Sequence, residues 1–357
     1  MRSILIFFSV IVMAVSFKIN TENAPMRADL FGQYIAKYKK RFSTIDEYNK
    51  RLKIFSQNIK KIEVLNQIHN RSSVIYDLNE FTYMSEQEFR NQKLMNFNAK
   101  RYEYGMEVLK EAKFVGSVND VQDLPEEFDW RTKNVVTPVK DQGSCGSCWA
   151  FSAMQNIESQ WAIKGNNLTS FSAQQLIDCD NQDCGCLGGW PQVAMKHLID
   201  NGGLSTEADY PYCAPPFGDC FSCVTNKTFC RPFSPYCNRT CLDAPKTVKL
   251  SSFELVSSDE EVIKAYLFKN GPLSIGINAL WLQFYSSGVS NPWYCDKEVD
   301  HAVLLVGYGI HRGYLGDTPY WLIKNSWAEG WGEKGYFRIY RGKGVCGVNT
   351  LVVNAVL

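Results

Sequence analysis

Residues 141–152 read DQGSCGSCWAFS, in which Cys145 and Cys148 are separated by two residues and an apolar run follows at once. Apolar residues then recur at helical spacing, which predicts a helix over residues 147–164. Cys148 would lie in the first turn of this helix, where unpaired backbone N–H groups and the helix dipole stabilise an anion. We therefore expect Cys148 to have an acidic, reactive thiol.

The cysteines are confined to one part of the chain. All 13 lie between Cys145 and Cys346, and none occurs in the first 144 of the 357 residues. Residues 1–16 place Arg2 ahead of an apolar segment that ends in small residues, which is typical of a signal peptide. That segment has about a dozen apolar residues, whereas a membrane anchor needs about 20, so we expect no stable anchor. We predict entry into the secretory pathway, oxidised cysteines, and a destination in a lysosome, a digestive vacuole or outside the cell.

The cysteine-free front part has the pattern of two amphipathic helices. One apolar stripe falls in residues 28–45 and a second in residues 48–65, with a capping signature that begins at Thr44. Residues 17–123 carry 18 Lys and Arg against 14 Asp and Glu, whereas residues 124–357 carry 19 against 23. Opposite net charges favour docking of one part on the other. The formal net charge of +1 for the whole chain gives no reason to expect a nucleic-acid partner.

After residue 124 the pattern changes from helices to strands. Helices are predicted over residues 147–164, 173–178 and 192–200. From residue 271 onward the sequence is strand-like, in LSIGINA, HAVLLVGYG, YWLIKNSW and GYFRIYRG. This order predicts an α+β fold with two lobes, and a site between two lobes is a common place for catalysis.

A thiolate nucleophile needs a proton acceptor, and the chain has four histidines. His69 belongs to the front part. His197 is predicted on the polar side of a helix and His311 in a glycine-rich turn. His301 opens an apolar strand that could fix its ring, so His301 is the best candidate.

Two further side chains complete a candidate catalytic set. Asn325, in KNSW, can accept a hydrogen bond from the second nitrogen of the His301 ring, and Trp327 can shield that bond from water. Gln142 can donate a side-chain N–H beside the backbone N–H of Cys148, so that a negatively charged oxygen is stabilised there.

These residues resemble those of the papain family of cysteine peptidases, in its cathepsin L-like group. The segments QGSCGSCWAFS, DHAVLLVGYG and KNSWAEGWGEKGYFRI occur in the family's order, and residues 145–149 match its signature C-G-[SA]-C-[WY]. The resemblance runs from about Asp29 to the C-terminus. It implies a papain-like fold, with a helical left lobe, a β-barrel-like right lobe and a cleft between them, preceded by a helical prodomain.

The resemblance also implies an activity. The protein would be a cysteine endopeptidase made as a zymogen, without a cofactor, in which the Cys148 thiolate attacks a peptide carbonyl and water hydrolyses the resulting thioester. Gly188 and Gly189 would pair with an extended substrate, and an apolar S2 pocket would prefer bulky apolar or aromatic P2 side chains over arginine. The other implied substrate-binding residues are Trp190, Pro191, Gly276, Ala302, Trp327 and Leu351.

In the front part, the resemblance rests on the ERFNIN spacing of cathepsin L-like propeptides. The six matching residues are Glu47, Arg51, Phe55, Asn58, Ile62 and Asn66. The companion motif G-x-N-x-F-x-D keeps Asn79 and Phe81, but Asp77 stands for the glycine and Tyr83 for the aspartate. This departure puts in doubt the acid-triggered release that the family implies.

The implied domain organisation is an inhibitory propeptide over residues 17–123 and a peptidase domain over residues 124–357, with cleavage near residues 120–124. The implied partners are protein and peptide substrates, the chain's own propeptide as inhibitor, and cystatin-like inhibitors. We expect a monomer.

For the cysteines, the resemblance implies the pairs Cys145–Cys186 and Cys295–Cys346, and pairs Cys179 with Cys213 or Cys220. A Cys-rich insertion over residues 213–241 is either a stapled surface loop, which we favour, or a lobe that restricts substrates or binds a partner. Four N-x-[ST] sequences are candidate glycosylation sites, at Asn70, Asn167, Asn226 and Asn238.

Three other functions remain as alternatives. A zinc module would use Cys145 with Cys148, or Cys220 with Cys223, but a secreted chain favours oxidised cysteines and we expect no metal. A thiol oxidoreductase would leave His301 without a role. An inactive, binding-only homologue is disfavoured because no candidate catalytic residue is replaced.

Overall fold

The computed structural model describes residues 24–69, 72–95, 99–119, 123–213, 245–314 and 316–357. We call residues 24–119 the front unit and residues 123–357 the rear unit. The predicted signal peptide and all but one residue of the predicted Cys-rich insertion fall outside the described residues.

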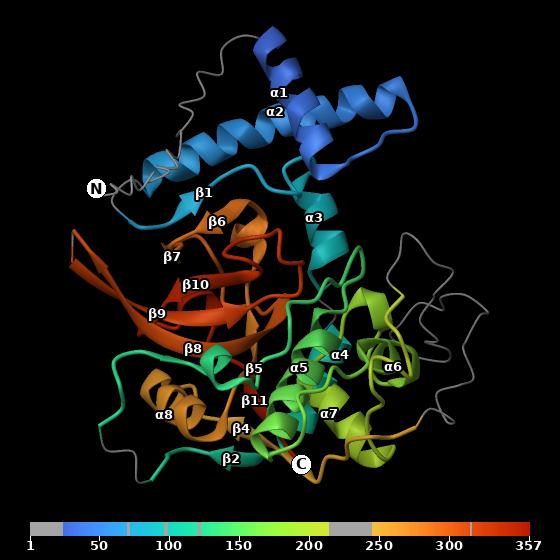
Figure 1. The fold of residues 1–357 in the computed structure, drawn as a ribbon, viewed down its shortest axis with the longest axis vertical. Helices are drawn as coiled ribbons and strands as arrows, with labels where there is room; N and C mark the ends of the chain where they lie inside the picture. Colours follow the sequence, from blue (N-terminus) through green and yellow to red (C-terminus); the bar gives the residue numbers. More distant parts are fainter. Residues whose placement is uncertain (1–23, 70–71, 96–98, 120–122, 214–244, 315) are drawn as a thin grey trace, which may run out of the picture.

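Two helices form the outer part of the front unit (Figure 1). They are α1 (Ala24–Tyr38) and α2 (Ile45–Ile68). The first helix therefore ends seven residues before the end of the range 28–45 in which its apolar stripe was predicted. Thr44 caps α2 by accepting the backbone N–H of Glu47 at 3.1 Å. Aromatic and aliphatic side chains hold the two helices together in a small core of Phe31, Tyr34, Phe55 and Ile59.

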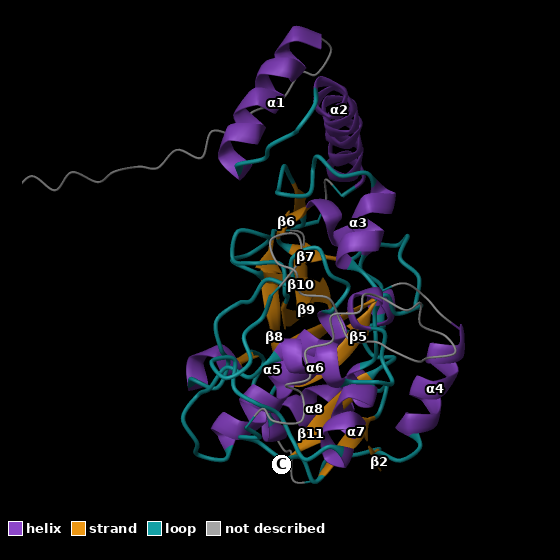
Figure 2. Cartoon of the chain, turned by 90° about the vertical axis from the view of Figure 1, so that its right-hand side faces the viewer, coloured by secondary structure: helices purple, strands orange, loops and turns teal. Residues whose placement is uncertain are grey.

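The rest of the front unit lies along the rear unit. Two further helices, α3 (Glu86–Lys93) and α4 (Ala99–Leu109), run down one side of the molecule (Figure 2). Strand β1 (Ile75–Tyr76) pairs with β6 (Tyr285–Ser287), and β2 (Lys113–Val115) pairs with β4 (Ser252–Val256). The front unit is therefore paired with rear-unit strands at two places, before α3 and after α4.

The first half of the rear unit is helical, as predicted. Its helices α5 (Cys148–Ile163), α6 (Ala173–Cys179) and α7 (Pro191–Asp200) match the predicted ranges within one residue at each end. Helix α5 is buried over its first three turns, polar residues included. Ser152 and Asn156, for example, donate hydrogen bonds to the carbonyl oxygens of Val303 and Pro272. It is the central helix of this lobe and packs against α6 and α7.

Among the described residues, the second half supplies seven strands of a nine-stranded sheet, and β2 of the front unit and β3 complete it. Its path is β2-β4-β11-β5-β8-β9-β10-β7, with β3 (Phe128–Asp129) paired to β8. Among the described residues this path stays open and does not close into a barrel. The sequence did not predict β4, β11 or the helix α8 (Glu260–Asn270) that packs on β8 and β4. The remaining strands are β5 (Leu273–Ile277), β7 (Val289–Ser290), β8 (His301–Gly313), β9 (Gly316–Lys324), β10 (Tyr336–Tyr340) and β11 (Val352–Val356).

Two hydrophobic cores define the two lobes. The core of the helical lobe contains Cys148 and Trp149, and the core of the sheet lobe contains Trp327. The front unit contributes Phe81 and Phe89 to the sheet-lobe core and Met95 to the helical-lobe core. It therefore spans the boundary between the lobes. None of the described helices combines the length and the apolar character required for a membrane span.

Candidate active site

Cys148 is the first residue of α5, and its side chain is fully buried. It is a free cysteine, and the backbone N–H of Ala302 hydrogen-bonds its sulfur, so the thiol lies beside the start of β8. Burial raises the pKa of Cys148 to about 12, and the backbone N–H groups of Ala302 and Trp149 offset only part of this effect. Our expectation of an acidic thiol is wrong for this form of the protein, because the front unit excludes water from the helix terminus.

His301 is the first residue of β8, and its ring is also fully buried. Its Nε2 lies 2.8 Å from Oδ1 of Asn325, which follows the end of the neighbouring strand β9. Its Nδ1 has no hydrogen-bond partner among the described residues, so this nitrogen is available for proton transfer. Burial lowers the pKa of His301 to about 4, the bond to Asn325 raises it, and the positive charge of Lys93 lowers it further.

Trp327 covers the histidine and its partner. The rings of Trp327 and His301 lie 4.8 Å apart, and the Trp327 side chain is fully buried. Phe81 and Phe89 of the front unit pack edge-on against the same indole at 5.4 and 5.3 Å. The predicted shield is therefore present, and it is also a surface on which the front unit docks.

Gln142 is held in a fixed orientation. Its Oε1 accepts hydrogen bonds from Ser326 Oγ at 2.7 Å and from Trp327 Nε1 at 3.1 Å. Its Nε2 donates to the carbonyl oxygen of Cys145 at 2.8 Å and to that of Lys93 at 3.1 Å. Because Lys93 belongs to α3, the front unit occupies the donor that we expected to stabilise an oxyanion.

The segment after α3 lies over the thiol. Lys93 Nζ donates to the Gly143 carbonyl at 2.7 Å, and the Met95 N–H donates to the Asp300 carbonyl at 2.7 Å. A methyl group on Gly146 would come within 3.0 Å of the Leu94 carbonyl. The same methyl group would come within 2.6 Å of the Cys186 carbonyl oxygen, so position 146 requires glycine. Lys93 and Met95 thus bind groups on both sides of Cys148, which the sequence had not indicated.

The predicted substrate-binding residues fall into two groups. Trp190 and Leu351 line a cavity of about 440 Å³, together with Val299 and with Tyr102 and Met106 from α4. Gly276 pairs with Ala302 across β5 and β8, and a methyl group on Gly276 would come within 2.7 Å of Val299. Among the described residues, Pro191, Gly276 and Ala302 do not line this cavity themselves. Pro191 is instead the first residue of α7.

Gly188 lies under the front unit, and Gly189 lies against side chains of the rear unit. A methyl group on Gly188 would come within 3.0 Å of Met95 Cβ, and one on Gly189 within 2.5 Å of both Asp183 Cγ and Trp149 Cδ2. Both positions therefore require the absence of a side chain, because the backbone is covered closely on each side.

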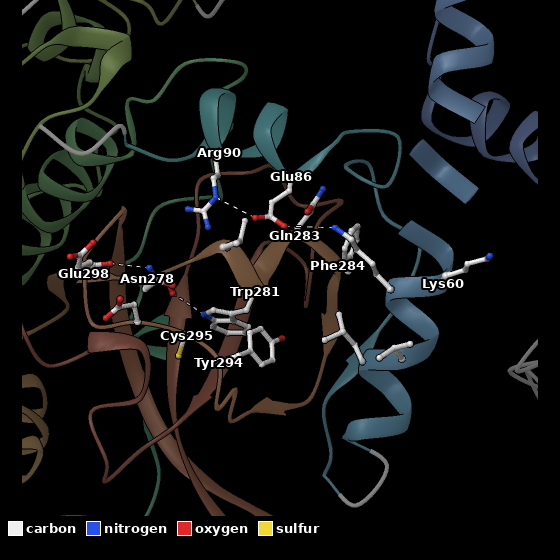
Figure 3. Close-up of a pocket in the computed structure, with 15 residues that line it drawn as sticks. Lys60, Glu86, Arg90, Asn278, Trp281, Gln283, Phe284, Tyr294, Cys295 and Glu298 are labelled. Carbon is white, nitrogen blue, oxygen red and sulfur yellow. Dashed lines mark hydrogen bonds and ion pairs between the residues drawn. The ribbon is translucent and has the colours of Figure 1, made fainter. Parts of the chain in front are cut away.

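A second cavity, of about 650 Å³, lies between the two units (Figure 3). Lys60 of α2 and Glu86 and Arg90 of α3 line one side, while Trp281 and Tyr294 of the rear unit line the other. Among the described residues, none of the four candidate catalytic side chains lines it. Its walls come from both units, so the cavity exists only while the front unit is docked.

The structure contains the disulfides Cys145–Cys186 and Cys295–Cys346, which are the two pairs that the resemblance implies. The first pair removes Cys145 as a zinc ligand or redox partner of Cys148. Among the described residues, no group of three or more His, Cys, Asp or Glu could hold a metal ion.

Three more cysteines, Cys179, Cys184 and Cys213, are also disulfide-bonded. Residues 214–244 lie outside the described part of the chain, so the pairing of Cys179 with Cys213 or Cys220 and the role of the insertion stay predictions. Asn70, Asn226 and Asn238 lie outside it as well, and Asn167 is exposed.

The six ERFNIN-type residues hold the front unit together. Asn58 Nδ2 donates to the carbonyls of Thr82 and Met84 at 2.8 Å each, and Asn66 exchanges two hydrogen bonds with the backbone of Tyr76. Phe55 and Ile62 are buried in two different cores. Glu47 and Arg51 form an ion pair on α2 at 2.5 Å.

Glu88 is a second carboxylate, besides Glu47, that pairs with Arg51. Arg51 Nη1 lies 2.7 Å from Glu88 Oε2, and the Tyr83 ring lies 5.3 Å from the Arg51 guanidinium. Burial raises the pKa of Glu88, but hydrogen bonds from Arg51 and from Ser85 outweigh it and lower the pKa to about 2. Because the pKa of Glu88 is lower in the folded protein than in the unfolded chain, its ionised form stabilises the folded front unit. This stabilisation is complete above the unfolded pKa of 4.5 and is lost as the pH falls toward the folded pKa of about 2.

We predict that Glu88→Gln weakens the front unit by about 1–2 kcal/mol at neutral pH, because Arg51 loses a charged acceptor. The variant should release its front unit at a higher pH than the parent, measured as the midpoint pH of conversion to the shorter form. Glu86→Gln is the matched control, since Glu86 is half exposed and its ion pairs are 3.6–3.7 Å long. Equal midpoints for the parent and Glu88→Gln would refute this role of Glu88.

Two histidine placements differ from the prediction. His197 is buried on α7, 3.9 Å from Asp180, and does not lie on a polar face. His311 lies in β8 and not in a turn. Neither difference affects the choice of His301. Among the residues that sequence reasoning missed, Ser326 stands inside the KNSW motif and could have been found there, whereas Lys93 and Met95 carry no motif.

The comparisons with known proteins agree with this geometry. The sequence profile of the papain family cysteine proteases matches residues 124–356, and that of the cathepsin propeptide inhibitor domain (I29) matches residues 31–89. The chain therefore belongs to the papain family of cysteine proteases and carries its own propeptide inhibitor domain. The front unit contains this inhibitor domain.

Individual relatives support the same assignment. Cathepsin F of Drosophila melanogaster is 41% identical over 92% of this chain, which spans about half (50%) of that protein's length. Cysteine proteinase 15A of Pisum sativum is 39% identical, over 90% of this chain and 84% of that protein. The solved structure of digestive procathepsin L2 proteinase from Tenebrio molitor larval midgut superposes with a TM-score of 0.77 at 29% identity, covering 93% of this chain and all (100%) of that one. The predicted papain-like α+β fold is confirmed, and the relatives include cathepsin F as well as a procathepsin L.

Proposed function

We propose that the protein is the zymogen of a cysteine endopeptidase in which Cys148 is the nucleophile, His301 the acid and base, Asn325 the residue that orients His301, and Gln142 the oxyanion donor. The observation that carries this proposal is the 2.8 Å bond between His301 Nε2 and Asn325. It fixes the ring and leaves Nδ1 available next to the residue whose N–H binds the Cys148 sulfur.

Catalysis would begin when the Cys148 thiol transfers its proton to His301 Nδ1 and the thiolate attacks the carbonyl carbon of the peptide bond. The negatively charged oxygen would receive hydrogen bonds from Gln142 Nε2 and the backbone N–H of Cys148. The imidazolium then protonates the leaving amine, which leaves a thioester on Cys148. Water, deprotonated by His301, attacks the thioester and releases the acid, and the proton returns to the sulfur.

Three features of the front unit support its role as an inhibitor. The Lys93 carbonyl accepts one N–H of Gln142, so that donor is occupied. Burial favours the neutral forms of both Cys148 and His301, and the Lys93 ammonium adds to this effect at His301. Met95 and Arg101 of the front unit cover Gly188. Removal of the front unit would return water to the site and free all of these groups at once.

The organisation of the precursor follows from the same proposal. A signal peptide over residues 1–16 would direct the chain to the secretory pathway, with a lysosome, a digestive vacuole or the extracellular space as its destination. Cleavage near residues 120–124 would release a monomeric peptidase that cystatin-like inhibitors could bind.

We also predict a preference for leucine or phenylalanine over arginine at P2. Trp190, Val299 and Leu351 line the 440 Å³ cavity, and burying a Leu or Phe side chain against them is worth about 1.5–3 kcal/mol. Asp296, Lys297 and Glu298 also line this cavity, so its wall is only partly apolar. The acid-activated protein should therefore cleave peptides with leucine at P2 at least about tenfold faster, in kcat/KM, than peptides with arginine at P2. Equal rates would exclude this cavity as the S2 pocket.

A thiol reagent tests the function itself. Iodoacetamide should abolish hydrolysis by the activated protein and add one carboxamidomethyl group, located at Cys148 by mass spectrometry of the digested chain. Under the same conditions the intact zymogen should remain unmodified, because its thiol is buried and protonated. Hydrolysis that persists after complete alkylation of Cys148 would contradict the proposed function.

A further inference from the structure

Arg101 of α4 is an arginine buried between the two units. Only 4% of its side chain is exposed, although arginine is almost never buried to that extent without compensation. Its Nη1 donates to the carbonyl oxygens of Leu187 at 3.3 Å and Gly188 at 3.2 Å. The front unit therefore places a guanidinium on the backbone to which a substrate is expected to bind.

A buried carboxyl group lies behind this backbone. Asp183 is fully buried, and its Oδ1 accepts the Trp190 N–H at 2.9 Å. A methyl group on Gly189 would come within 2.5 Å of Asp183 Cγ, so the carboxyl lies directly against the Gly188–Gly189 backbone.

The charges of Arg101 and Asp183 interact. Burial lowers the pKa of Arg101, and the negative charges of Asp183 and Cys148 raise it. Burial and the neighbouring Asp180 raise the pKa of Asp183 well above its usual value, and the positive charge of Arg101 offsets only part of this. When the front unit leaves, Asp183 and the two carbonyl oxygens lose this cation, while the protein retains the cost of a buried carboxyl.

We propose that the carbonyl oxygens of Leu187 and Gly188, with the Asp183 carboxyl behind them, form a subsite for an arginine side chain of the substrate, and that Arg101 occupies this subsite in the zymogen. The inference rests on the proposed endopeptidase function. An arginine side chain presents several N–H donors in a plane, which suits adjacent carbonyl oxygens, and a nearby carboxyl balances its charge.

This subsite differs from the 440 Å³ cavity described above. The next residue, Tyr102, lines that cavity, with its ring 5.9 Å from the Trp190 ring. Consecutive residues of α4 thus place a guanidinium on the Leu187–Gly188 carbonyls and an aromatic ring beside Trp190. We therefore assign the arginine preference to a substrate position other than P2, where Trp190, Val299 and Leu351 favour leucine or phenylalanine.

The test is an arginine scan with the acid-activated protein. Fluorogenic peptides with leucine fixed at P2 carry arginine at P4, P3, P1 or P1′ in turn, each matched with a peptide that has citrulline, the uncharged isostere, at the same position. At one position the ratio of kcat/KM for arginine over citrulline should be at least about tenfold, the usual size of one charge-assisted interaction. Asp183→Asn, which keeps the Oδ1 acceptor for Trp190, should reduce that ratio to about two or less.

Asp200→Asn is the control, because it removes one exposed carboxylate from α7 of the same lobe and should leave the ratio unchanged. A wild-type ratio near one at every position overturns the inference, whether or not the Asp183 variant folds. A ratio that Asp183→Asn leaves unchanged overturns it too. In both cases continued cleavage of the citrulline peptides would leave the endopeptidase function standing, whereas the alkylation experiment tests that function separately.

Discussion

Replacing Cys148 with alanine is expected to abolish peptide hydrolysis and self-processing. Loss of a catalytic nucleophile leaves only the contribution of substrate binding and oxyanion stabilisation, so kcat should fall at least about 10⁴-fold. The zymogen should remain full-length at a pH at which the parent protein converts to its shorter form. Substrate hydrolysis and the molecular mass after acid treatment are the two measurements.

This result depends on the variant being folded. The Cys148 side chain is small and backbone N–H groups hydrogen-bond its sulfur, so its removal should leave the fold intact. Added wild-type peptidase should process the Cys148→Ala zymogen to the same product, which shows that its front unit is still cleavable. Substantial residual turnover in pure Cys148→Ala protein would refute the assignment of the nucleophile.

Replacing Gln142 with alanine is expected to reduce kcat by about 10²–10³-fold with a much smaller change in KM. The side chain is positioned before substrate binds, because Ser326 and Trp327 hold its carbonyl oxygen and the Cys145 carbonyl accepts one N–H. Removal of the front unit would free the second N–H, which the Lys93 carbonyl accepts in the zymogen. An N–H donor that acts mainly on a developing negative charge affects the transition state more than the bound substrate.

Ser326→Ala is the matched control for Gln142. It removes one of the two hydrogen bonds that orient Gln142 but keeps the donor, so it should reduce kcat by about tenfold or less. Wild-type kcat in Gln142→Ala would show that the oxyanion receives its hydrogen bonds elsewhere. An equal loss in both variants would assign Gln142 a purely structural role.

The main helices and strands could be predicted because their signals are local. The helix α5 and the strands β5, β8, β9 and β10 each have a clear apolar pattern within a short window, and all were found within a few residues. Helix α3 has only eight residues and was missed, although Ser85 and Glu88 form a capping box at its start that the sequence displays. Helix α8 was missed in the same way, although Asp259 caps it.

The candidate catalytic residues could be chosen from the sequence because each is a chemically distinctive residue within a recognisable motif. The sequence by itself determined the family and the helical and sheet lobes, and it was sufficient to propose Cys148, His301, Asn325 and Gln142 as the catalytic set.

Only the tertiary structure decided the state of these groups. Whether the Cys148 thiol is acidic depends on whether water reaches it, and that depends on a segment near Lys93 about fifty residues earlier in the chain. The hydrogen bond from Gln142 to the Lys93 carbonyl and the interaction of Arg101 with Asp183 also join residues that are far apart in the sequence. Desolvation and charge pairing are set by what packs together in space, and a local window of sequence does not contain that information.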